Sequence, residues 1–157
     1  MVEKCKERKV DLMTIEIPGL KDHNELLNVW EASVRASHDF LAEKDIQAYK
    51  HLIGTDYLKS LSLYCIKRQE VISGFLGVDD KLIQMLFVHP IYMKQGVGKA
   101  LLNFAISVCK ITEVDVNEQN IEALAFYKRF GFEPFERYES DAAGKPFPVL
   151  SLVLKNT

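Results

Sequence analysis

The sequence has 157 residues, of which 48% are hydrophobic, enough for one globular domain with a buried core and too few for a second domain. Its 20 basic and 22 acidic side chains are scattered along the chain and give a net charge of −2, which argues against a nucleic-acid partner. There is no run of 18 apolar residues for a membrane span and no apolar core of a signal peptide. We therefore expect a cytoplasmic protein that binds no membrane.

Residues 1–10 form a charged N-terminal lead, and we expect a single domain over residues 11–157. Cys5, Cys65 and Cys109 lie far apart without C-x-x-C or Cys/His spacing, so we expect reduced thiols and no metal site. Composition leaves two oligomeric states open, a monomer and a homodimer.

Apolar periodicity predicts the elements of an α+β domain. In chain order these are a strand at 11–17, a helix from 21 or 22 to about 36, a break at 37–41, a polar helix to about 55, strands at 61–67, 71–78 and 81–88, a helix at 96–109, a strand at 111–116, a helix at 120–130, and two strands around a hairpin at 141–146. Gly74 and Gly77 weaken the middle strand and indicate a bulge.

Two features of the first helices invite an interpretation. Trp30 lies on the apolar side of the first helix, and we expect it in the core because single helical aromatics usually pack. His38 and Asp39 fall in the break between the helices. Either Asp39 caps the second helix, or the pair orients a substrate or relays a proton.

Residues 84–108 carry the strongest functional signal. A buried strand is followed by a short loop, and Gly96 and Gly98 open an amphipathic helix. The first turn of a helix has unpaired N–H groups and a partial positive charge, and glycines let a phosphate approach them closely. Lys94 and Lys99 add cations, so the sequence predicts an anion site here.

Two common phosphate motifs do not fit this anion site. A nucleotide P-loop, G-x-x-x-x-G-K-S/T, would need glycine where the chain has Met93 and a hydroxyl where it has Ala100. A Rossmann G-x-G-x-x-G would need glycine at Leu101. A nucleotide-binding protein remains only a weak alternative.

The segment from Val88 to Leu102 instead resembles the coenzyme A pyrophosphate loop of the GNAT family, the GCN5-related N-acetyltransferases, which reads V-x-P and then Q/R-x-x-G-x-G/A. The matching residues are Val88, Pro90, Gly96, Gly98, Ala100, Leu101 and Leu102. The chain departs from the pattern at Met93, where the family usually has Gln or Arg, and we expect this to weaken the grip on the cofactor.

A second GNAT resemblance lies about 20 residues further on, in V-N-x-x-N-x-x-A-x-x-F-Y-K-x-x-G-F. It matches Val116, Asn117, Asn120, Ala123, Phe126, Tyr127, Lys128, Gly131 and Phe132. Within the family, the HDFL, VNEQN and D-x-x-G-K-P-F-P segments are similar to those of the bacterial YjaB-type N-acetyltransferases. The resemblance implies an α/β/α sandwich with a mixed six- to seven-stranded sheet and about four helices.

The resemblance also implies an activity: transfer of an acetyl group from acetyl-CoA to a primary amine of a small molecule or peptide. The implied cofactor contacts are Leu86, Phe87, Val88, Met93, Lys94, Gln95, Gly96, Val97, Gly98, Lys99, Ala100, Asn117 and Asn120. The Val88 N–H would bind the thioester oxygen, between strands that separate. Tyr127 would be the general acid, and the acceptor pocket would be built by His38, Asp39, Phe40, Tyr92 and Asp141.

Several of these residues allow a second interpretation. Tyr127 can simply pack in the core, and Asn117 and Asn120 can cap a helix. The general base is open among His38, Asp39, His89, Tyr92, Asp115 and a water chain. No cysteine shows a signal for a lowered pKa, so we expect direct attack in a ternary complex. The alternative function is an acyl-CoA-binding regulatory module without turnover.

Overall fold

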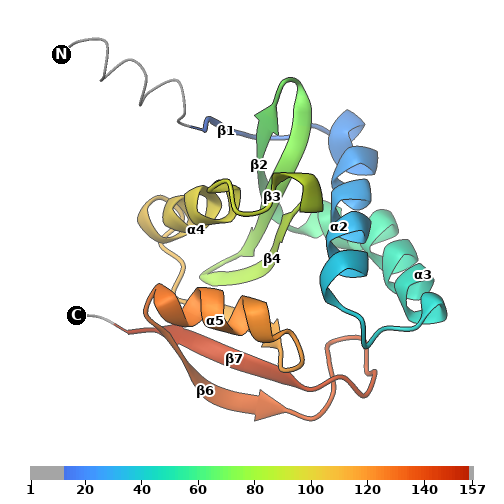
Figure 1. Ribbon diagram of the computed structural model, residues 1–157, viewed down its shortest axis with the longest axis vertical. Coiled ribbons are helices and arrows are strands. Elements are labelled where there is room, and N and C mark those ends of the chain that lie inside the picture. The colour runs from blue at the N-terminus through green and yellow to red at the C-terminus, as the bar shows by residue number, and fades with distance from the viewer. Residues whose placement is uncertain (1–12, 156–157) are drawn as a thin grey trace.

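The computed structural model describes residues 13–155 (Figure 1). The charged lead, Cys5 and the first two residues of the predicted first strand lie outside the described residues.

A single seven-stranded sheet, in the order β1-β2-β3-β4-β5-β7-β6, is the centre of the fold (Figure 1). Its strands are β1 (Ile15–Glu16), β2 (Ser62–Arg68), β3 (Val71–Asp79), β4 (Leu82–Val88), β5 (Glu113–Asn117), β6 (Phe132–Tyr138) and β7 (Val149–Leu154). All neighbouring strands are antiparallel except β4 and β5, which are parallel. The predicted mixed sheet is confirmed.

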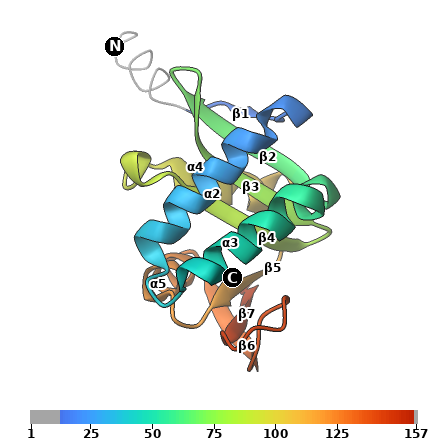
Figure 2. The same cartoon turned by 90° about the vertical axis from the view of Figure 1, so that its right-hand side faces the viewer.

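Helices cover both faces of the sheet (Figures 1 and 2). On one face lie α2 (His23–Ser37) and α3 (Glu43–Leu52), and on the other lie α4 (Val97–Ser107) and α5 (Ile121–Arg129). Short helical turns are η1 (Leu20–Asp22), η2 (Ile53–Tyr57), η3 (Leu58–Ser60) and η4 (Pro90–Tyr92). The layers are those of the predicted α/β/α sandwich.

Two apolar clusters fill the space between the sheet and its helices. Successive strand residues point to opposite faces, so Phe75 of β3 packs towards α2 and α3 while Leu76 packs towards α4 and α5. Trp30 belongs to the first cluster with 4% of its surface exposed, which confirms its predicted core position.

The bulge predicted in the middle strand is confirmed beside Gly74. Ile66 of β2 pairs with Gly74 but Lys67 pairs with Ile72, which leaves Ser73 of β3 as an extra residue. At Gly77 the extra residue lies on the partner strand, because Gly77 pairs with Met85 and Val78 with Ile83, which leaves Gln84 of β4 between them. Gly74 also permits close packing. A Cβ there would lie 2.7 Å from Val97 Cγ1, so the absence of a side chain lets the start of α4 pack closely on β3.

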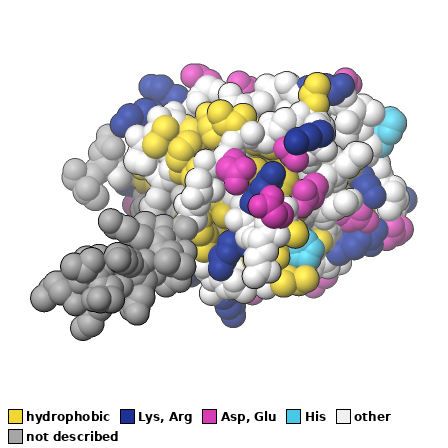
Figure 3. All heavy atoms as spheres, turned by 90° about the horizontal axis from the view of Figure 1, so that it is seen from above, with side chains coloured by type: hydrophobic (Ala, Val, Ile, Leu, Met, Phe, Trp, Pro, Cys, Tyr) yellow, Lys and Arg dark blue, Asp and Glu magenta, His cyan; other side chains and the backbone are white. Residues whose placement is uncertain are grey.

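The polar surface is mixed in charge. The face in Figure 3, which looks down on Figure 1 from above, shows Lys and Arg side chains interspersed with Asp and Glu. Among residues 13–155, no helix is long and apolar enough to cross a membrane.

Candidate active site

The site is organised by a separation of two strands. β4 and β5 pair only at Leu82–Glu113 and Ile83–Val114. Beyond this point, β4 stays paired with β3 and β5 stays paired with β7 through Asn117–Val149, but β4 and β5 do not pair with each other. We call the gap between β4 residues 84–88 and β5 residues 115–117 the split. The expected separation of these strands is confirmed.

Backbone groups of β4 face the split. The His89 N–H donates to Ser73 O on β3 at 2.8 Å. Successive N–H groups of an extended strand point to alternate sides, so the Val88 N–H points the other way, towards β5. This N–H therefore faces the split, and its contact with a thioester oxygen stays a prediction.

The start of α4 lies beside the split. Gly96 is the N-cap of α4 with φ +88°, in the left-handed region, and no side chain of residues 13–155 caps the helix. The following first-turn N–H groups have no partner within the helix itself. A Cβ on Gly98 would lie 3.6 Å from both Val88 Cγ2 and Phe126 Cζ. The positive end of α4 thus adjoins the end of β4 and the side of α5, at the open end of the split.

The remaining predicted cofactor residues lie around this helix start. Met93, Lys94, Gln95 and Lys99 are exposed, Val97 is buried, and Leu86, Phe87 and Ala100 are partly buried. Gln95 Nε2 donates to Ile91 O at 3.2 Å, which steadies the loop. Their role in binding stays a prediction.

The two asparagines at the end of β5 differ. Asn120 Oδ1 accepts a hydrogen bond from Ala123 N at 3.2 Å, so Asn120 caps α5 as one reading predicted. Asn117 Oδ1 is buried and has no hydrogen-bond partner among the described residues. A buried amide oxygen without a donor costs about 1–3 kcal/mol, so this atom at the edge of the split fits a ligand N–H.

Tyr127 of α5 lies in the core with 6% of its surface exposed, in the cluster that also contains Val116 of β5. Its ring centroid is 5.2 Å from Phe126 and 5.7 Å from Phe132. Its hydroxyl makes no hydrogen bond within residues 13–155, and burial raises the pKa of the phenol. Tyr127 therefore packs in the core. Its hydroxyl is also a hydrogen-bond donor with no acceptor among residues 13–155.

His38 and Phe40 lie in the connection between α2 and α3 and belong to an aromatic cluster. His38 is buried, its Nδ1 lies 2.7 Å from Ser37 Oγ, and burial lowers the pKa of its imidazole. Its ring lies 5.2 Å from Phe40, which in turn lies 5.6 Å from Phe147 in the loop between β6 and β7. Segments about a hundred residues apart meet here.

The capping reading of Asp39 is wrong. Asp39 is exposed, and the N-cap of α3 is Ala42. Ala42 N donates instead to Asp45 Oδ2 at 3.3 Å. Asp45 supplies the acceptor because it stands at the third helical residue, where its side chain can reach back to the cap.

Asp141 and Tyr92 are placed differently from each other. The Asp141 carboxylate accepts from the Tyr49 hydroxyl, from Ala143 N at 3.0 Å and from Lys145 N at 2.9 Å, so it is largely satisfied by protein donors. Tyr92 is partly buried in η4, with its ring 6.2 Å from His89.

Sequence reasoning missed a polar group at the closed end of the split. The Tyr57 hydroxyl donates to Gln84 Oε1 at 2.6 Å, and Gln84 is the bulged residue of β4. Asp115, the first residue of β5 beyond the last β4 pair, accepts from Ser151 Oγ at 2.6 Å. Tyr57 and Gln84 are 27 positions apart, so no local signal could have paired them.

Other ligand sites are less well supported. Among the described residues, no three His, Cys, Asp or Glu side chains group in a way that could hold a metal ion. A cavity of about 500 Å³ is lined by β1–η1 and η3–β2 residues such as Pro18 and Ser62, at the β1 edge of the sheet and away from the split.

Comparisons with known proteins agree with this geometry. Residues 31–147 match the acetyltransferase (GNAT) domain. The chain is 34% identical over 134 residues to the peptidyl-lysine N-acetyltransferase YjaB of Salmonella typhimurium, covering 85% of this chain and 92% of that protein. The solution structure of apo-form YjaB from Escherichia coli has a TM-score of 0.83 at 29% identity and covers 93% of this chain and 99% of that one.

A third protein shares the fold at lower identity. It is the PaiA N-acetyltransferase from Thermoplasma acidophilum, solved in complex with coenzyme A, with a TM-score of 0.72 and 19% identity over 89% of this chain and 98% of that one. The motifs around Gly96 and Asn120, the split sheet and these matches lead to one assignment: the chain belongs to the GNAT family of N-acetyltransferases.

Proposed function

We propose that this protein transfers the acetyl group of acetyl-CoA to the side-chain amine of a lysine in a peptide or protein, or to a comparable small primary amine. The observation that carries the proposal is the split between β4 and β5, which begins after Ile83–Val114 and opens beside the positive end of α4. The name of the Salmonella relative, a peptidyl-lysine N-acetyltransferase, supports lysine as the first acceptor to test.

The chain offers matching groups for the two ends of acetyl-CoA. First-turn N–H groups of α4, with Gly96 and Gly98 at the turn, suit the diphosphate, and Lys94 and Lys99 add positive charge. The split suits the pantetheine arm, because strand edges with free backbone groups bind amides. The buried Asn117 Oδ1 offers an acceptor to an amide N–H of that arm.

The chemistry requires a polarised carbonyl, a neutral amine and a proton for the departing thiolate. In this proposal the Val88 N–H stabilises the negative charge on the thioester oxygen. Tyr127 donates its phenol proton to the departing sulfur and regains a proton from the acceptor nitrogen, which loses one as the amide forms. The base that takes the proton from the acceptor ammonium is open among His38, Asp39, His89, Tyr92, Asp115 and a water chain.

Direct attack by the amine is favoured over an acetyl-cysteine intermediate. Cys65 is buried, and burial raises the pKa of its thiol to about 11. Burial also raises the pKa of Cys109. Neither is a thiolate near neutral pH, so neither is a good nucleophile.

The test is release of coenzyme A thiol from acetyl-CoA in the presence of lysine-containing peptides, with mass spectrometry of both the peptide and the protein. We expect an acetyl group on a peptide lysine and none on a cysteine. Binding of acetyl-CoA without thiol release across peptides, polyamines and small amines would instead establish the acyl-CoA-binding module. Rapid acetylation of a protein cysteine before the acceptor is added would exclude direct attack.

A further inference from the structure

The loop between β6 and β7 reaches α3 through two polar contacts. The Tyr49 hydroxyl donates to the Asp141 carboxylate, and Lys145 Nζ lies 3.2 Å from Asp45 Oδ1. The partners are 92 and 100 positions apart in the sequence. We call these four side chains the clasp.

The clasp connects two halves of the molecule that the sheet itself joins only weakly. β5, β7 and β6 meet the other strands through just the two residue pairs between β4 and β5. The β6–β7 loop leads into Val149, which pairs with Asn117, so the loop emerges at the open end of the split. α3 packs on the other half, over β2 to β4. The clasp is therefore a second connection, on the α2/α3 side.

Hydrogen bonds within the β6–β7 loop fix the two loop residues of the clasp. Asp141 Oδ1 accepts from Ala143 N and Lys145 N, while Asp141 N donates to Lys145 O at 3.0 Å. These bonds fold the loop into a tight turn that fixes the Asp141 carboxylate towards Tyr49 and the Lys145 ammonium towards Asp45. Lys145 Nζ also lies 5.7 Å from the centre of the Tyr49 ring, within range of a cation–π contact.

The contacts are shielded from water more than surface pairs are. The Asp45 side chain is 13% exposed and that of Lys145 30% exposed. Burial and the Asp141 charge raise the pKa of the Tyr49 phenol, so it remains a donor at neutral pH. A partly buried ion pair is screened less by salt than an exposed one.

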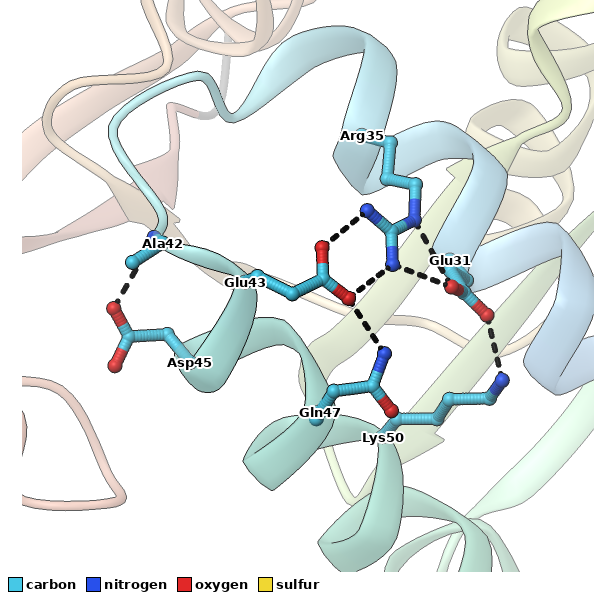
Figure 4. A network of polar contacts seen from close by, with 7 residues as sticks. All are labelled: Glu31, Arg35, Ala42, Glu43, Asp45, Gln47 and Lys50. Carbon is cyan, nitrogen blue, oxygen red and sulfur yellow. Dashed lines mark hydrogen bonds and ion pairs between the residues drawn. The ribbon is translucent and has the colours of Figure 1, made fainter.

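The α3 side of the clasp is held in place by α2 (Figure 4). Arg35 of α2 donates to both carboxylate oxygens of Glu43 at 2.8 Å, and Lys50 of α3 lies 2.7 Å from Glu31. Glu43 also accepts from Gln47 at 2.8 Å. Each exposed pair contributes little alone, but a bidentate network fixes orientation. The loop, rather than α3, is therefore the adjustable side of the clasp.

The clasp lies beside His38 and Phe40, two residues of the predicted acceptor pocket. Phe147, two residues after Lys145, packs 5.6 Å from Phe40, and Phe40 packs against His38. Moving the loop would therefore move this aromatic contact. The helix start that suits coenzyme A lies on the other side of the sheet.

We propose that the clasp positions the acceptor: Tyr49–Asp141 and Lys145–Asp45 hold the β6–β7 loop where it forms the acceptor's binding wall and so set acceptor affinity. These four are positioning residues and do not take part in the chemistry. The proposal rests on the proposed acetyltransferase function. It assigns Asp141 a role in holding the loop rather than in binding the amine.

Steady-state kinetics of Tyr49→Phe and Lys145→Met with a lysine peptide test this. Loss of one partly buried hydrogen bond or ion pair corresponds to about a five- to tenfold change in affinity. We expect the acceptor KM to rise by that factor in each variant, with kcat and the acetyl-CoA KM within about twofold of wild type. A lower acceptor KM would overturn the proposal, because the clasp would then only obstruct entry.

Matched controls exist elsewhere on the chain. Tyr138→Phe removes a hydroxyl that donates to Glu136 at 2.9 Å, and Lys155→Met removes an exposed pair with Glu133 at 3.8 Å. Both should leave the acceptor KM unchanged. Lys145→Arg keeps the positive charge opposite Asp45, so it should retain most of the acceptor affinity lost in Lys145→Met. An unchanged acceptor KM in the clasp variants, or an equal rise in the acetyl-CoA KM, contradicts the proposal.

The two proposals fail differently. If wild type releases no thiol with any amine, the acetyltransferase function fails and the clasp has no acceptor to position. If wild type turns over and the clasp variants match it, only the clasp proposal fails.

Discussion

Ile83 and Val114 form the last pair between β4 and β5, and Gln84 directly after Ile83 is the bulged residue of β4. The separation is not fraying at a sheet edge, because β4 stays bonded to β3 and β5 stays bonded to β7 on either side. Backbone groups inside a sheet need partners. A ligand with amides along its length can provide them, which is why the split suits the arm of coenzyme A.

The two glycines at the start of α4, Gly96 and Gly98, yield opposite predictions for the stability of an alanine variant. In Gly98→Ala, the new methyl group makes only ordinary contacts, 3.6 Å from its nearest neighbours, and Ala is a better helix former by about 0.5–1 kcal/mol. We expect a stable fold but coenzyme A affinity lower by about tenfold, or ~1.4 kcal/mol, because the methyl occupies the phosphate approach. Calorimetric titration with coenzyme A and urea unfolding would measure the two effects.

Gly96→Ala is the matched control for backbone strain. Its φ of +88° is unfavourable for alanine by about 1–2 kcal/mol, so this variant should lose stability before any ligand is added. Wild-type affinity for coenzyme A in Gly98→Ala would show that the diphosphate binds elsewhere.

Removing the Tyr127 hydroxyl distinguishes its proposed role as general acid from a purely packing role. Tyr127→Phe keeps the packing against Phe126 and Phe132 and removes a group that has no hydrogen bond within residues 13–155. We therefore expect little change in melting temperature and a fall in kcat of about 10- to 100-fold if the phenol protonates the thiolate. Thiol release under saturating acetyl-CoA checks this. A Tyr127→Phe variant with wild-type kcat would leave the tyrosine a purely structural role.

The parts of the fold that local patterns determine could be predicted from the sequence. Alternation marked β2, apolar runs marked β3 and β4, and glycines marked both the bulge and the start of α4, because these features depend on neighbouring residues. Helix periodicity located α4 and α5 to within a few residues. The second helix was predicted to continue to about residue 55. In the structure α3 ends at Leu52, and the chain continues as a π-helical turn.

The contacts of the acceptor side could not be predicted in this way. Tyr49 meets Asp141 across 92 positions, and nothing in the sequence near either residue indicates the other. The capping alternative for Asp39 failed for a related reason, since several acidic residues near a helix start compete for the cap and geometry selects Asp45. Long-range pairs depend on the assembled fold, which local propensity does not describe.

Asn117 provides a test of the split that does not require turnover. Asn117→Leu keeps a similar shape and removes the buried oxygen that has no partner among the described residues. Because an unpaired buried acceptor costs about 1–3 kcal/mol, the free protein should be as stable as wild type or more stable. Coenzyme A should bind about fivefold more weakly, since one hydrogen bond of ~1 kcal/mol is lost. Unchanged affinity in a well-folded Asn117→Leu would place the pantetheine arm away from this atom.

His38 links stability to pH. Burial holds the pKa of its imidazole below the usual value near 6.5, so the unfolded chain binds a proton that the folded chain resists. The folded state therefore keeps its full advantage above about pH 6.5 and loses it as the pH falls towards the lowered pKa, by at most ~1.4 kcal/mol per pH unit. Urea unfolding from pH 5 to 8 should show a smaller loss on acidification in His38→Gln than in wild type. The exposed His51 provides the control: His51→Gln should follow the wild-type curve, and equal pH dependence in all three proteins would mean that His38 titrates alike in the folded and unfolded states.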